Sequence, residues 1–155
     1  MAIYQDFKRL LALFNSNKVE YLVVGSHALA FYGALPRRAE LDLYVRPTKA
    51  NAARLMAALD AFGFGDIGLR QSDFEEAGQI IRLGDPRERV ALVTSIHGVS
   101  WEQAVAGQCP GECEGEPVPF IGRTELIANK KAAGRPQDLA DAERLEGPPS
   151  RKPSP

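Results

Sequence analysis

The residues best suited to chemistry are a glycine-serine pair and two nearby carboxylates. Gly25 and Ser26 follow a short apolar run, and Glu40 and Asp42 stand two positions apart further along the chain. Glycine lets the backbone come close to a ligand, and the N–H groups that open a following helix attract anions. Alternate residues of a strand share a face, so both carboxylates would point the same way. This combination suits phosphate groups bound together with Mg²⁺.

Hydrophobic periodicity predicts the elements that would position these residues. A buried strand over 21–24 leads into the Gly-Ser pair, and Ser26 is expected to cap a short helix that runs to Tyr32. A strand over 40–45 alternates, with Leu41 and Leu43 on the face opposite the acids. The remaining expected elements are helices over 3–14, 48–62, 101–107, 124–133 and 136–145, strands over 79–83 and 89–94, and an edge strand over 117–121. Interleaved helices and strands predict an α/β (α+β) fold with a mixed sheet of about four or five strands.

Length and composition restrict the class of protein. The chain has 155 residues, 45% of them hydrophobic, which suits one ordinary domain with a real core. A net charge of −1 argues against a strongly basic nucleic-acid binder and leaves a local basic patch open. No apolar run is long enough to cross a bilayer and no secretory signal opens the chain, so we expect a cytoplasmic protein without membrane contact. The expected division is a domain over 1–146 and a disordered, proline-rich tail over 147–155.

The pattern around these residues resembles the nucleotidyltransferase superfamily, which has the polymerase-β-like fold. The resemblance rests on the motif formed by the Gly-Ser turn and the alternating acidic strand that follows it. Phe7–Val45 resembles the opening of small bacterial members related to abortive-infection and toxin–antitoxin nucleotidyltransferases. Leu126–Asp141 resembles their C-terminal helical segment, so the resemblance covers about residues 5–146. It implies a nucleotidyltransferase fold, with flanking helices and a C-terminal helical pair.

The resemblance also implies roles for individual residues. The protein would transfer a nucleoside monophosphate from Mg²⁺-bound NTP to an acceptor hydroxyl. Gly25 and Ser26 would bind the nucleotide phosphates. Asp42 and Glu40 would be the catalytic, metal-ligating carboxylates, and Lys130 would neutralise the triphosphate during catalysis. The acceptor stays open between an RNA end, a protein hydroxyl and a small molecule.

Two departures from the family pattern bear on activity. Glu40 stands where the pattern has aspartate, and Ala91 stands where a third acid is expected. Three explanations remain open: a divergent member, a third acid from elsewhere such as Asp85 or Glu88, or substitutions at these positions. The competing hypothesis is therefore a binding module that keeps at most nucleotide affinity. Such a module would act through a partner protein, as in a toxin–antitoxin pair.

The C-terminal segment contains further charged residues. Asp138 and Asp141 are expected to form ion pairs that hold the last two helices together. Lys130 and Arg135 are the candidate partners. Arg37 and Arg38 lie in the loop before the acidic strand. Two interpretations of them stay open: contacts to phosphate or to an acidic partner, or solvated loop residues.

Overall fold

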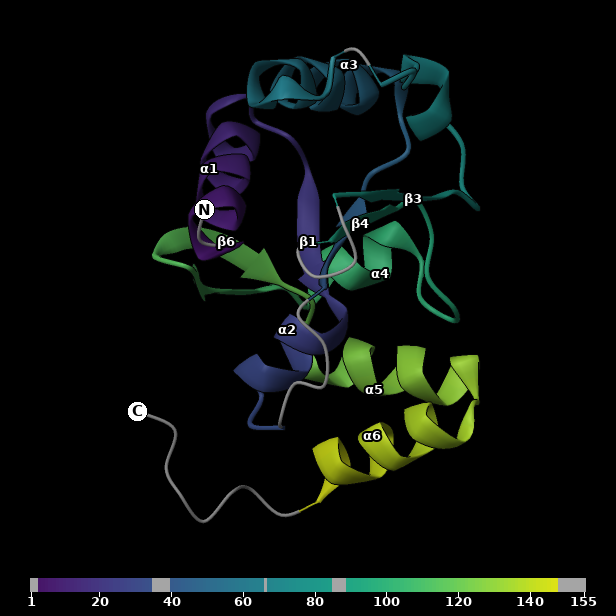
Figure 1. Ribbon diagram of the computed structural model, residues 1–155. Helices are drawn as coiled ribbons and strands as arrows, with labels where there is room; N and C mark the ends of the chain where they lie inside the picture. The colour runs from purple at the N-terminus through teal and green to yellow at the C-terminus, as the bar shows by residue number, and fades with distance from the viewer. Residues whose placement is uncertain (1–2, 35–39, 66, 85–88, 148–155) are drawn as a thin grey trace.

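A six-stranded mixed sheet forms the centre of the protein, where four or five strands were predicted. The computed structural model describes residues 3–34, 40–65, 67–84 and 89–147 (Figure 1). The strands lie in the order β3-β4-β2-β1-β6-β5. They are β1 (Tyr21–Val24), β2 (Leu41–Val45), β3 (Ile80–Leu83), β4 (Val90–Val93), β5 (Cys109–Cys113) and β6 (Glu116–Phe120). β1 pairs antiparallel with β2 and parallel with β6, β2 pairs parallel with β4, and the outer strands β3 and β5 pair antiparallel with β4 and β6.

Six α-helices flank this sheet in the described part of the chain. They are α1 (Ile3–Ser16), α2 (Gly25–Phe31), α3 (Lys49–Leu59), α4 (Trp101–Ala106), α5 (Arg123–Ala133) and α6 (Pro136–Glu146), with a π-helical turn η1 (Asp60–Phe64) and a 3-10 turn η2 (Gln71–Phe74). In Figure 1, α5 and α6 lie together at the bottom of the view, beyond α2, and α3 lies at the top. Within the described helices, none is long and apolar enough to cross a membrane.

Local sequence signals explain where the C-terminal helical pair begins and ends. Gly134 ends α5 in the left-handed conformation at φ 72°, and Pro136 occupies the first turn of α6. Proline fits there because the first N–H groups of a helix have no partner within it. The side chain of Arg123 donates to the backbone carbonyl of Leu145, which ties the start of α5 to the end of α6. The predicted helical pair is therefore present.

The predicted alternation of β2 is also present. Leu41, Leu43 and Val45 are fully buried in the core, and Asp42 points to the opposite face, where it is partly exposed. Because the side chains of a strand alternate between faces, the buried leucines fix which way the carboxylate of Asp42 points. The core thus orients an acid on the far face of the sheet.

Besides the number of strands, two sequence predictions were wrong. Residues 117–121 were expected to form an edge strand, but β6 is an interior strand between β1 and β5, and β5 was missed. The prolines of β6 suggested an edge strand, because proline has no N–H to donate to a neighbouring strand. In the structure these prolines are paired with residues of β5, and β6 pairs with β1 through Phe120 and Val23. Ser26 does not cap a helix: α2 begins at Gly25, and Val24 is at the cap position without a side-chain hydrogen bond.

Some predictions fall outside the described residues. These concern Arg37 and Arg38 in the loop before β2, Asp85 and Glu88 as sources of a third acid, and the tail from 148 to 155.

Candidate functional site

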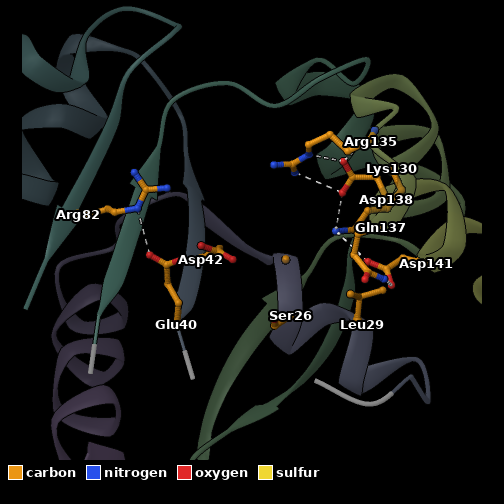
Figure 2. Close-up of a pocket in the computed structure, with 11 residues that line it drawn as sticks. Ser26, Leu29, Glu40, Asp42, Arg82, Lys130, Arg135, Gln137, Asp138 and Asp141 are labelled. Carbon is orange, nitrogen blue, oxygen red and sulfur yellow. Dashed lines mark hydrogen bonds and ion pairs between the residues drawn. The ribbon is translucent and has the colours of Figure 1, made fainter. Parts of the chain in front are cut away.

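A pocket of about 330 Å³ opens between one face of the sheet and the helical pair α5–α6 (Figure 2). Its walls come from the β1–α2 turn, β2, β3 and both C-terminal helices. Its lining residues are Gly25, Ser26, Leu29, Glu40, Asp42, Arg82, Lys130, Arg135, Gln137, Asp138 and Asp141. All five residues singled out from the sequence as site residues line this one pocket. The roles predicted for them remain predictions.

The Gly-Ser turn and the acidic strand fit tightly together. Gly25 has a φ of +68°, and a Cβ atom built on it would lie 2.0 Å from Oδ2 of Asp42. Asp42 is also paired with Val24, the last residue of β1. Only glycine leaves room for the carboxylate here and adopts this backbone conformation without strain. The sequence motif therefore corresponds to a direct contact between a backbone turn and an acid.

The second acid of the motif is ion-paired. Nε of Arg82 on β3 donates to Oε2 of Glu40 at 3.3 Å. The side chain of Glu40 is 11% exposed, whereas that of Arg82 is 51% exposed. Sequence reasoning missed Arg82, because its strand gives no sign of which strand it will pair with.

The register of the sheet places Ala91 beside the acids. Ala91 on β4 pairs with Asp42 on one side and with Arg82 on the other, and it is 2% exposed. The third acid was expected at this position from the sequence. The structure puts the position next to Asp42, and the residue there is an alanine, which offers neither a metal ligand nor a base.

Lys130 lies on the opposite wall, between two buried acids. Its Nζ is 3.6 Å from Oδ1 of Asp138 and 3.5 Å from Oδ2 of Asp141. Arg135 adds a shorter contact, with Nε 2.6 Å from Oδ2 of Asp138. The predicted ion pairs between α5 and α6 are therefore present. Lys130 lines the pocket, and it also joins the two helices.

Two polar side chains at this wall complete the site. Arg135 has a side chain that is 76% exposed, although Asp138 holds its guanidinium group. Gln137 donates from Nε2 to Oδ1 of Asp141 at 3.2 Å. Arg135 is thus an exposed cation with a fixed orientation at the pocket. Sequence reasoning considered it only as an ion-pair partner.

His27, the residue after Ser26, faces elsewhere. It lines a separate hollow with Phe31 and Glu112, and its ring packs edge-on against Phe7. Burial lowers the pKa of His27, which favours the neutral ring at pH 7. It takes no part in the pocket.

The ionisation of Asp138 predicts how acid affects stability. Burial alone would raise the pKa of Asp138, but the hydrogen bond from Arg135 and the charge of Lys130 outweigh burial and hold that pKa below its usual range. A carboxyl group with a lower pKa in the folded state stabilises the protein above its unfolded pKa of about 3.9 and loses this effect as the pH falls further. We expect Asp138→Asn to lower the melting temperature at pH 7, and the difference from wild type to shrink below about pH 4. A difference that stays constant from pH 7 to pH 3 in thermal denaturation would contradict this.

The residues of the pocket fit one Mg²⁺ ion better than two. The parts of the chain that the structure describes contain no group of three or more His, Cys, Asp or Glu residues that could hold a metal ion. Mg²⁺ commonly binds through one or two carboxylates together with substrate phosphates. Asp42 is a carboxylate of this kind in the pocket, and Glu40 is a second one that is ion-paired with Arg82. A pair of bridged ions would need further carboxylates.

Comparison with solved structures identifies the fold as that of the nucleotidyltransferases. The solution structure of the antibiotic-resistance factor ANT(2'')-Ia matches with a TM-score of 0.53 and 16% identity, over 92% of this chain and 80% of that chain. The crystal structure of ANT(2'')-Ia in complex with adenylyl-2''-tobramycin also matches at 0.53 and 16%, over 92% and 86%. No protein-family model and no curated protein matches the sequence. The fold predicted from the sequence is therefore confirmed.

Proposed function

We propose that the protein binds a nucleoside triphosphate in this pocket and transfers its nucleoside monophosphate to an acceptor hydroxyl. The observation that carries the proposal is the contact of Asp42 with Gly25, inside a pocket whose described lining also includes three basic side chains. A carboxylate beside a tight backbone turn, facing fixed cations, suits a phosphate chain with its metal ion. The fold shared with ANT(2'')-Ia supports the same reaction class.

Each side chain has a part in this reaction. The backbone at Gly25 and the hydroxyl of Ser26 contact phosphate oxygens. Asp42 would hold Mg²⁺, and the bound ion would neutralise part of the phosphate charge. The cations on the helical wall, Lys130 and Arg135, face the negative charge of the triphosphate. The rate enhancement then comes mainly from positioning and electrostatics.

The transfer forms one bond at the α-phosphorus and breaks another. The acceptor oxygen forms a bond to the α-phosphorus, and the bond from that phosphorus to the bridging oxygen breaks. Pyrophosphate leaves with the bonding electron pair, and the acceptor proton passes to a carboxylate or to water. The crystal structure of ANT(2'')-Ia contains an adenylylated small molecule. A small-molecule hydroxyl is therefore one acceptor to test here, beside RNA ends and protein hydroxyls.

Asp42→Asn tests the metal-binding part of this proposal. In the presence of Mg²⁺, we expect any NTP that binds to raise the melting temperature of the protein. A free NTP concentration of 100 times Kd stabilises the folded state by about 2.7 kcal/mol. The variant should weaken binding of Mg²⁺-NTP more than binding of metal-free NTP, since an amide is a poorer Mg²⁺ ligand. Calorimetric titration with and without EDTA measures both values. Asp60→Asn, an exposed aspartate outside the pocket, is the matched control. Equal weakening of both forms would show that Asp42 is not a ligand.

Transfer of radioactive NMP to candidate acceptors, or to the protein itself, tests the reaction.

The second candidate function is a nucleotide-binding module that acts through a partner protein, of the toxin–antitoxin kind. The buried Ala91 beside Asp42 favours it, because alanine cannot supply a base. Nucleotide binding without labelling of any acceptor would favour this module. Labelling by the wild-type protein would exclude it.

A further inference from the structure

Arg82 lies on the face of the sheet that carries the acids. Asp42, Ala91 and Arg82 are paired in turn across β2, β4 and β3. Directly paired residues have side chains on the same face of a sheet. Figure 2 shows the guanidinium group of Arg82 on the same side as the carboxylates of Glu40 and Asp42.

The guanidinium group of Arg82 therefore lies where a second divalent ion would need carboxylate ligands. Two-metal sites hold their ions roughly 3.5–4 Å apart between shared carboxylates. Here Glu40 is bound by the guanidinium group at 3.3 Å, and Ala91 contributes no oxygen. Arginine stays protonated at any physiological pH, so its charge repels a second divalent ion. The residues that the structure describes around the pocket do not fit a two-metal site.

The same arginine is well placed to bind an anion. Its side chain is 51% exposed and lines the pocket, and Glu40 fixes its orientation through Nε. An ion pair made through Nε leaves the terminal nitrogens of a guanidinium group available as donors to phosphate. Arg135 faces the pocket from the helical wall, with a side chain that is 76% exposed. Two oriented guanidinium groups thus border one cavity from opposite sides.

We propose that Arg82 supplies the positive charge of a second divalent cation, so that the pocket binds triphosphate directly and does not depend on Mg²⁺ for this binding. This inference rests on the proposed function, because it takes a triphosphate as the ligand. Mg²⁺ still strengthens binding, because the ion neutralises part of the triphosphate charge and Asp42 offers it a carboxylate. Among the described residues that line the pocket, the cations are Arg82, Lys130 and Arg135, and the carboxylates are Glu40, Asp42, Asp138 and Asp141.

Calorimetric titration with inorganic triphosphate and with ATP tests this proposal, in excess EDTA and in excess MgCl₂. Inorganic triphosphate is useful because it does not depend on recognition of a base. We expect wild type to bind both ligands in EDTA. Arg82→Gln should weaken binding in EDTA about 10- to 100-fold, the loss typical of a hydrogen bond to a charged group, and added Mg²⁺ should restore most of the loss. Arg82→Lys keeps the charge without the guanidinium fork, so it should retain part of the metal-free binding.

Arg54→Gln is the matched control, because Arg54 is an exposed arginine that is ion-paired with Glu20 away from the pocket. Far-UV circular dichroism and the melting temperature check that each variant is folded. Binding of wild type only with Mg²⁺, or equal weakening of Arg82→Gln with and without Mg²⁺, would overturn the role of Arg82 and leave the proposed function standing. Failure of both ligands to bind under either condition would overturn the proposed function and this inference together.

Discussion

Lys130→Met is expected to destabilise the protein by about 3 kcal/mol, because it removes the cation between two buried carboxylates. Asp138 is 3% and Asp141 is 4% exposed, and Nζ of Lys130 is within 3.6 Å of both. Methionine fills a similar volume but leaves both acids without this charge. For a chain of this size the melting temperature should fall by roughly 6–12 °C. Chemical denaturation measures the free energy of unfolding directly.

Lys131→Met is the matched control at the next position. Lys131 contacts Glu146 at 2.7 Å, but both side chains are about half exposed, at 54% and 45%. Exposed ion pairs contribute about 0–1 kcal/mol. A loss for Lys130→Met no larger than that for Lys131→Met would show that the charges between α5 and α6 do not hold the helices together.

Gly25→Ala is expected to cost stability and abolish triphosphate binding together. The added Cβ would lie 2.0 Å from Oδ2 of Asp42, so the carboxylate must move. The left-handed φ of +68° adds strain of about 1–2 kcal/mol for a residue with a side chain. Overpacking adds about 1–3 kcal/mol. Denaturation and NTP titration measure the two effects separately.

The control variant Gly33→Ala distinguishes the effect of backbone strain from the effect of the contact with Asp42. Gly33 also has a positive φ, of +97°, but a Cβ there would meet nothing within 4 Å. It should show the backbone strain alone and keep ligand binding. In Gly25→Ala, the further change Asp42→Ala should recover part of the lost stability, because it removes the clashing carboxylate. If Gly25→Ala binds NTP as wild type does, the contact with Asp42 is not part of the binding site.

Much of the fold followed from signals that neighbouring residues carry. Thr48 caps α3 by accepting from the backbone N–H of Asn51, and Ser100 and Gln103 form a capping box at the start of α4. Such signals are readable because the interacting atoms lie within one turn of chain. The missed strand β5, Cys109–Cys113, had no such signal. Its Pro-Gly sequence resembles a turn, and it forms a strand only by pairing with β6.

The candidate site also combines features that the sequence predicts with features that depend on the tertiary structure. The sequence alone determined that Gly25 and Asp42 belong to one motif, because a glycine turn and an alternating acid have a recognisable order along the chain. Only the tertiary structure decided the environment of Glu40. Its partner Arg82 is 42 positions away, and the two meet because β2, β4 and β3 pair in one register. Register depends on how whole strands pack against the core, so the charge beside the acids could not be predicted from neighbouring residues.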